Sequence, residues 1–127
     1  MKKKYDKTLI CVTYNLTSEN TEYLSYENYP KLPCVSALRM SANLPLIFEK
    51  YKYGNSLYVD GGISDNFAID IGEKYGESIL GIMINSESSG SNDFSTNSDM
   101  NTLEFFYKLI FVPVNQNIKY KINNCSK

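Results

Sequence analysis

The stretch from Leu57 to Phe67 constrains this chain more than any other, because a short apolar strand runs directly into an acid and two glycines. It reads Leu-Tyr-Val-Asp-Gly-Gly-Ile-Ser-Asp-Asn-Phe. Open α/β sheets bind their ligands at the carboxyl ends of buried strands, and Asp60 stands at such an end. Gly61 and Gly62 permit a sharp turn and the close approach of another group. Asp60 is therefore the best candidate for a catalytic group.

The first part of the chain reads as strand, loop and helix. Residues 8–14 form a nearly continuous apolar run, typical of a central strand in a parallel sheet that is buried on both faces. The polar residues 15–33 predict a loop, with a short antiparallel strand around Glu22–Ser25. A helix is expected after Pro33, which suits a first turn, and Pro45 should end it. The residues expected on one shared face of this helix are Val35, Leu38 and Ala42.

The next part repeats the alternation. Residues 57–59 predict a strand and residues 67–75 a helix, with a buried stripe of Ala68, Ile71, Gly72 and Tyr75. Gly76 is expected to end this helix in a left-handed cap, and residues 79–84 read as a third buried strand. The order of strands and helices predicts an α/β fold with a mostly parallel sheet and flanking helices. The side chains expected to cap the start of the second helix are Ser64, Asp65 and Asn66.

The amino-acid composition changes in the last part of the chain. Residues 86–99 are rich in Ser, Asn, Gly and Asp, which predicts a mobile polar loop. Residues 100–127 hold an apolar helix, expected over 102–112 with a Glu104–Lys108 pair, and a weakly patterned tail. A helix that is apolar on most sides either packs in a core or lies at a lipid interface, and we favour the core.

Composition excludes several classes of function. A chain of 127 residues supports one domain, and its net charge of −1 gives no basis for binding nucleic acid. The absence of histidine excludes a Ser-His-Asp triad and most zinc sites, so we expect no metal and no cofactor. Three widely spaced cysteines predict reduced thiols. With no signal peptide and no membrane-spanning run, a cytoplasmic location is expected.

Two motifs in this order resemble the carboxyl-terminal half of a patatin-like phospholipase domain. Residues 34–48 are similar to the family's helix that ends in Ser-Ala-x-x-Pro-x-x-Phe, and Tyr58-Val59-Asp60-Gly61-Gly62 followed by Asn66 resembles its aspartate motif. The strand at 9–15 also looks like the one that precedes them in the family. The resemblance covers residues 8–85 and implies part of a three-layer patatin-like fold. Ala68 departs from the family, which usually has proline after the asparagine.

The resemblance implies hydrolysis of lipid acyl esters by a serine–aspartate dyad. Asp60 would be the base, Gly61 and Gly62 would shape the approach to it, and Asn66 would bond the backbone of the glycine turn. An aspartate with an ordinary pKa of about 4 is a weak base at neutral pH, so burial must raise its pKa or the site must stabilise the charged intermediate. The substrate would be a lipid at a membrane surface, with the protein bound there peripherally.

The serine half of the dyad is missing from the sequence. The family's nucleophile stands in a Gly-x-Ser-x-Gly turn, and neither this turn nor a glycine-rich oxyanion loop occurs in the 127 residues. Ser41 and Ser64 are better explained by helix packing and by capping. Two hypotheses follow: the chain supplies Asp60 to a partner chain that carries Gly-x-Ser-x-Gly, or it is a non-catalytic remnant or binding module.

Overall fold

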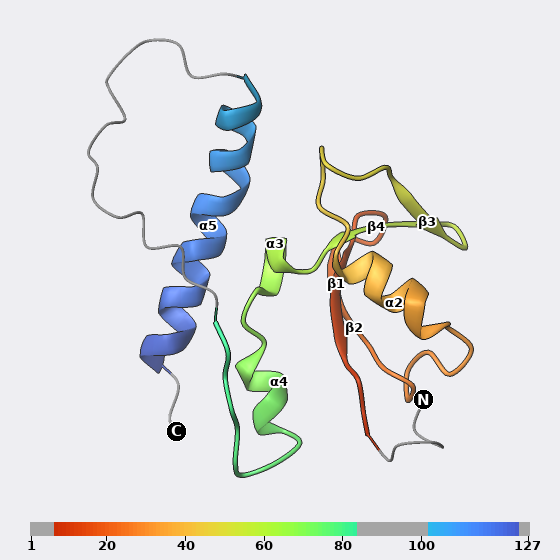
Figure 1. Ribbon diagram of the computed structural model, residues 1–127, viewed down its shortest axis with the longest axis vertical. Helices are drawn as coiled ribbons and strands as arrows, with labels where there is room; N and C mark the ends of the chain where they lie inside the picture. Colours follow the sequence, from red (N-terminus) through yellow and green to blue (C-terminus); the bar gives the residue numbers. More distant parts are fainter. Residues whose placement is uncertain (1–6, 84–101, 125–127) are drawn as a thin grey trace. The chain divides into compact units, whose positions relative to one another are not determined.

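The chain divides into two compact units, the first ending at Asn66 and the second beginning at Phe67 (Figure 1). The structure is a computed structural model that describes residues 7–83 and 102–124. The second unit contains the helices α4 (Ile69–Glu73) and α5 (Thr102–Asn124). The first unit contains six elements: β1 (Cys11–Asn15), β2 (Asn20–Leu24), α2 (Cys34–Ser41), β3 (Tyr51–Tyr53), β4 (Ser56–Asp60) and α3 (Gly62–Asp65).

A four-stranded sheet in the order β2-β1-β4-β3 forms the centre of the first unit. Every strand pairing among the described residues is antiparallel, so the prediction of a mostly parallel sheet is wrong. The combination of this sheet with helices confirms the α/β class. Short connections explain the antiparallel direction of the β1–β2 and β3–β4 pairs, since a parallel pair needs a crossover of a dozen residues or more. Residues 16–19 join β1 to β2, and the β3–β4 hairpin turns at Gly54, whose φ of 59° suits a glycine.

One face of β1 packs against α2. Cys11, Thr13 and Asn15 alternate along the strand and are all buried, and the hydroxyl of Thr13 lies 3.4 Å from the Met40 carbonyl oxygen of α2. The helix buries Ala37 and Met40, which share a cluster with Cys11, Leu24 and Tyr58. The predicted face was wrong, because Val35 is 76% and Leu38 49% exposed. The small Ala37 allows close approach to the sheet, and the flexible Met40 fills the remaining space.

The opposite face of the sheet meets α3. Tyr23 neighbours Leu24 on β2 and therefore points away from α2, and its hydroxyl donates a hydrogen bond of 2.7 Å to the buried carboxylate of Asp65. Figure 1 accordingly shows α2 and α3 on opposite sides of β1. The predicted cap at this point was wrong: the N-cap position of α4 is Ala68, whose side chain has no hydrogen-bond acceptor, and Asn66 ends α3 instead.

The second unit departs most from the predictions. In place of one helix over 67–75 there is the short α4, which buries none of its residues and is not ended by a left-handed Gly76. Residues 79–83 form no strand, and Leu80 and Ile82 are 84% and 80% exposed. A strand requires a hydrogen-bonded neighbour, which an apolar pattern alone does not supply. Ile84 and the predicted loop at 86–99 lie outside the described residues.

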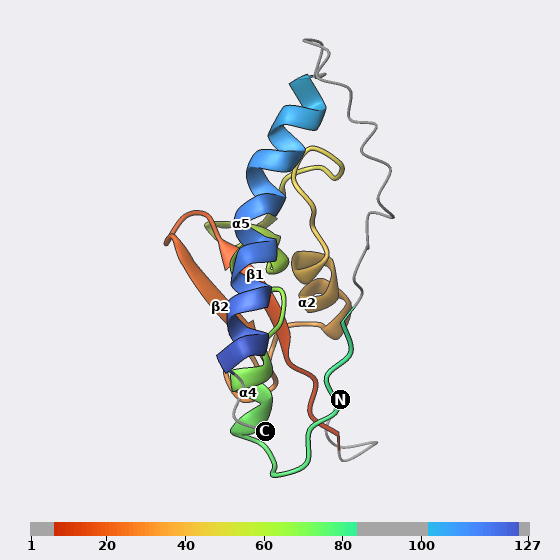
Figure 2. The ribbon, with the colours of Figure 1, turned by 90° about the vertical axis from the view of Figure 1, so that its left-hand side faces the viewer.

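The last helix is longer than expected. α5 continues through Pro113 to Asn124, as Figures 1 and 2 show, although proline usually ends a helix. Phe105, Phe106 and Leu109 are about half exposed, so the prediction that this helix is a core helix is wrong for these side chains. The predicted partner Glu104 lies outside the described side chains. Neither described range contains a helix with the length and apolarity needed to cross a bilayer.

Candidate active site

Asp60 is the last residue of β4, and the backbone around it is fixed from three directions. It stands opposite Thr13 of β1 in the antiparallel register. Its backbone N–H donates to the carbonyl oxygen of Asn43 over 3.0 Å. Its Oδ1 accepts a hydrogen bond of 2.6 Å from the N–H of Gly62. The half-buried carboxylate is thus held at a strand end and turned toward the following turn.

The two glycines are needed because other atoms lie very close to them. A Cβ on Gly61 would overlap the carbonyl group of Val12 and would lie 2.7 Å from the nitrogen of Thr13. A Cβ on Gly62 would lie 2.8 Å from Oδ1 of Asp60 and 2.8 Å from Oδ1 of Asn66. Neither glycine has a positive φ, so close approach rather than an unusual backbone angle selects glycine here. The structure thus shows close approach at both glycines, whereas their role in shaping the approach to Asp60 stays a prediction.

Burial raises the pKa of Asp60 above its ordinary value, while the hydrogen bond from the Gly62 N–H acts in the opposite direction. Loss of hydration disfavours the charged carboxylate, and this is the larger of the two effects. The direction is the one that a carboxylate needs to accept a proton near neutral pH. This direction agrees with the sequence-based expectation for Asp60, and the role of Asp60 as a base stays a prediction.

Thr13 and Asn43 support the strand that carries Asp60, and the sequence did not single them out. Thr13 is fully buried and donates its hydroxyl to the carbonyl oxygen of Val59 over 2.8 Å. Asn43 is 2% exposed and donates its side-chain amide to the carbonyl oxygen of Tyr58 over 2.9 Å. Asn43 comes just after Ala42, the C-cap of α2, so it links that helix to β4. The signal that could have revealed Asn43 is a polar residue between the helix and Pro45.

The remaining predicted residues lie close to the turn with different contacts. Asn66 is exposed, with its Oδ1 beside Gly62, and its predicted bond to the turn backbone stays a prediction. Ser64 lies inside α3 and donates its hydroxyl to the carbonyl oxygen of Gly61 over 3.2 Å, so its assignment as a helix cap was wrong. This use of its proton also argues against Ser64 as the nucleophile. Ser41 is half-buried at the end of α2.

Within residues 7–83 and 102–124, acidic and cysteine side chains form no group of three or more that could hold a metal ion. The candidate site is therefore defined by Asp60, the turn at Gly61 and Gly62, and the residues that fix them. A half-buried carboxylate at a strand end, oriented by a backbone amide, can accept a proton from a nucleophile brought next to it.

Residues 2–72 match the sequence profile of the patatin-like phospholipases. Because the match covers more than half of the chain and includes Asp60, Gly61 and Gly62, the chain belongs to the patatin-like phospholipase family.

A similar protein is "Probable lipid hydrolase 463L" of Invertebrate iridescent virus 6. The two sequences are 40% identical over 73 residues, which cover 58% of this chain and 25% of the viral protein. The aligned part of this chain thus spans about a quarter of the length of that relative.

Proposed function

We propose that this chain supplies Asp60 as the general base for hydrolysis of a lipid acyl ester, with the nucleophilic serine coming from residues outside this sequence. The observation that carries the proposal is the half-buried Asp60 carboxylate at the end of β4, oriented by the Gly62 N–H over 2.6 Å. Membership of the patatin-like family and the likeness to a probable lipid hydrolase support the lipid ester as substrate.

The proposed chemistry uses the environment of Asp60 in two ways. Burial makes its carboxylate a stronger base than an exposed aspartate, because the protonated form is favoured. The Gly62 amide fixes the direction of the carboxylate, so that an approaching serine hydroxyl meets an oriented acceptor. Asp60 would take the serine proton as the hydroxyl oxygen attacks the ester carbonyl, and would return it to the leaving alcohol.

The proposed partner is a segment that carries Gly-x-Ser-x-Gly together with a glycine-rich oxyanion loop, since this sequence contains neither. With that segment added, we infer a three-layer patatin-like arrangement around the sheet. A peripheral position on a membrane surface would then give the site access to lipid. The alternative function is a non-catalytic remnant or binding module, and the same experiment distinguishes the two.

The first test is to search neighbouring reading frames for a segment with Gly-x-Ser-x-Gly and to co-express it with this chain. The pair should hydrolyse a long-chain fatty acyl ester, and Asp60→Asn should reduce kcat by about 100-fold or more, because the variant cannot accept the serine proton. Initial rates on vesicles that contain the ester measure the effect.

Asp70→Asn is the matched control. It makes the same chemical change at the 55% exposed Asp70, which pairs with Lys121 in the second unit, and it should leave the rate within about two-fold of wild type. Equal rates for Asp60→Asn and wild type would remove Asp60 from the mechanism. A bound but inactive pair would favour the non-catalytic alternative.

A further inference from the structure

Two thiols of the first unit face the same pocket. Cys11 of β1 and Cys34, the first residue of α2, both line a cavity of about 130 Å³ between the sheet, α2 and residues 25–32. Both are free cysteines, Cys11 buried and Cys34 half-buried. The candidate active site uses neither of them.

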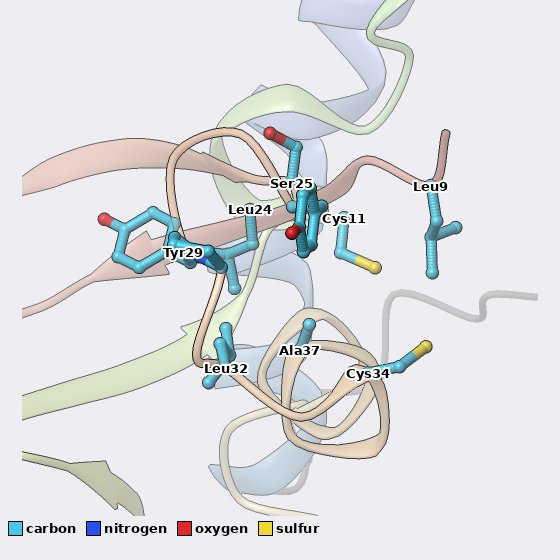
Figure 3. A pocket seen from close by; sticks show the side chains of 10 residues that line it. Leu9, Cys11, Leu24, Ser25, Tyr29, Leu32, Cys34 and Ala37 are labelled. Atoms are coloured by element: carbon cyan, nitrogen blue, oxygen red, sulfur yellow. The ribbon is translucent and has the colours of Figure 1, made fainter. Parts of the chain in front are cut away.

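Helix geometry explains why Cys34 lines the same pocket as Cys11. Cys34 and Ala37 are three residues apart on α2 and therefore share one face of the helix. Ala37 packs in the same cluster as Cys11, so Cys34 lies one turn earlier along the same face. In Figure 3 the sulfur atoms of Cys11 and Cys34 point to the same side of the pocket, toward Leu9.

The two thiols differ in their exposure to solvent. Cys34 is partly open to solvent, whereas Cys11 is 5% exposed. Burial raises the pKa of the Cys11 thiol, and the neighbouring Cys34 raises it further. A thiol that is accessible at the surface and a buried thiol that lines the same pocket can act in sequence in thiol–disulfide exchange.

We propose that Cys11 and Cys34 form a reversible dithiol–disulfide site that is oxidised by a low-molecular-weight disulfide such as oxidised glutathione. The thiolate of Cys34 attacks one sulfur of the reagent, which forms a mixed disulfide and releases one thiolate of the reagent. Cys11 then loses its proton and attacks the sulfur of Cys34, which releases the second reagent thiol. Two protein thiols are thereby oxidised and one reagent disulfide is reduced to two thiols.

The pair of thiols favours a disulfide over a metal site. Two sulfur ligands do not complete the tetrahedral set that zinc prefers, and the part of the chain that the structure describes holds no group of three acidic or cysteine side chains. The bond would join β1 to the start of α2 and would close the connection that contains β2 and the loop 25–32. Oxidation should therefore stiffen the pocket and raise the melting temperature.

The test uses the full chain with Cys125→Ser, so that only two thiols remain. The chain is equilibrated in mixtures of reduced and oxidised glutathione, and intact mass and free thiols are measured. The expected product has lost two hydrogens, melts at a higher temperature and reverts with dithiothreitol. Half-oxidation should require at least about ten-fold less oxidised glutathione in the folded chain than in urea, because folding raises the effective concentration of one thiol at the other.

Single variants separate the two roles. Cys11→Ser should stop at a stable mixed disulfide on Cys34, and Cys34→Ser should react slowly, because its remaining thiol is buried. The proposal is overturned if the two-cysteine chain itself accumulates only the mixed disulfide, forms disulfides between molecules, or oxidises no more readily when folded than in urea. These comparisons use the two-cysteine chain, so they hold even if a single variant fails to fold.

Discussion

Gly61 occupies its position because the backbone of β1 passes where a side chain would begin. The Cβ of any other residue would overlap the Val12 carbonyl group, which belongs to a paired strand and cannot rotate away as a flexible side chain could. The turn after Asp60 is thus fixed by contact between two backbones. The position of the carboxylate depends on this contact.

We expect Gly61→Ala to destabilise the first unit by about 1–3 kcal/mol, because β1 and β4 must move apart to accept the methyl group. Urea denaturation followed by circular dichroism measures the loss. Gly76→Ala is the control, since a Cβ there would meet nothing within 4 Å, and it should change stability little. An unchanged urea midpoint for Gly61→Ala would contradict the close packing of the two strands.

At the scale of elements, Glu22 of β2 ties the loop after β2 to the sheet. Its carboxylate accepts a hydrogen bond of 2.7 Å from the Tyr29 hydroxyl and another of 2.7 Å from the side-chain amide of Asn15. The hydrogen bond to Glu22, with burial as a second cause, raises the pKa of Tyr29 to about 12. The neutral phenol is therefore the form that the folded state prefers.

This shift predicts a loss of stability at alkaline pH. The contribution of Tyr29 is complete below about pH 10, the ordinary pKa of tyrosine in an unfolded chain, and it disappears as the pH rises through about 12. Tyr29→Phe should lower the melting temperature near neutral pH, and the difference from wild type should shrink between about pH 10 and about pH 12. Tyr26→Phe, at a 54% exposed position in the same loop, is the control. A difference that stays constant over this range would contradict the assignment.

The second unit has an ion pair between its two helices. Nζ of Lys121 on α5 lies 2.8 Å from Oδ1 of Asp70 on α4, and the hydrogen bond from Lys121 lowers the pKa of Asp70. Asp70 is half exposed, so solvent screens the pair and its contribution is small.

Lys121→Met should weaken the attachment of α5 to α4 by about 0.2–1 kcal/mol at neutral pH. Because the pKa of Asp70 is lowered on folding, the contribution is present above the unfolded value near 4 and is lost as the pH falls through the folded value. Amide hydrogen exchange at the end of α5 measures it. Lys119→Met, at an exposed position, should leave amide exchange at the end of α5 unchanged. An equal increase in exchange for both variants would argue against the Lys121–Asp70 pair.

Elements with a strong local pattern could be predicted from the sequence. The strands near 11–15 and 56–60 and the helix after Pro33 lie where apolar runs and prolines placed them. Strand direction could not be predicted, because an apolar run reads the same in parallel and antiparallel sheets. Residues 79–83 show the same limit, since their pattern is that of a strand but pairing depends on a neighbour elsewhere.

Some residues of the candidate site could likewise be predicted from the sequence, and others could not. Asp60, Gly61 and Gly62 are consecutive, so the motif reveals them together. Thr13 could not be identified, because its hydrogen bond to the Val59 carbonyl group spans 46 positions along the chain. Asn43 is closer in sequence, yet its role follows only from where α2 ends against β4. Local chemistry is readable from the sequence, whereas support from distant backbone requires the fold.

At the scale of the whole molecule, many large apolar side chains are exposed for a chain of this length. They occur in both units and include Val35, Leu46, Ile47, Leu80 and Ile82, each at least 65% exposed. Exposed apolar side chains favour association, and an unpaired run of aliphatic residues favours it through strand pairing. We expect the isolated chain to self-associate.

Replacing both Leu80 and Ile82 with lysine should reduce this association, because two charges disfavour strand pairing at 79–83. Sedimentation velocity over a range of concentrations measures it, and circular dichroism should stay unchanged because both side chains are exposed. The same double replacement at the exposed Glu77 and Ser78, which adds one positive charge more than the Leu80/Ile82 variant, is a stringent control for charge. Equal association of the wild type and the Leu80/Ile82 variant would exclude this segment as the contact.

The order of the strands has a consequence for how the site forms during folding. The β1–β2 pair closes across four residues and the β3–β4 pair across two, whereas the β1–β4 pair joins Thr13 to Asp60. Contacts between residues near in sequence form faster, so we expect both hairpins to close before β1 meets β4. Asp60 then gains its final surroundings in the slowest step. A chain stopped before that step would have most of its strands, and Asp60 would lack its contacts with β1.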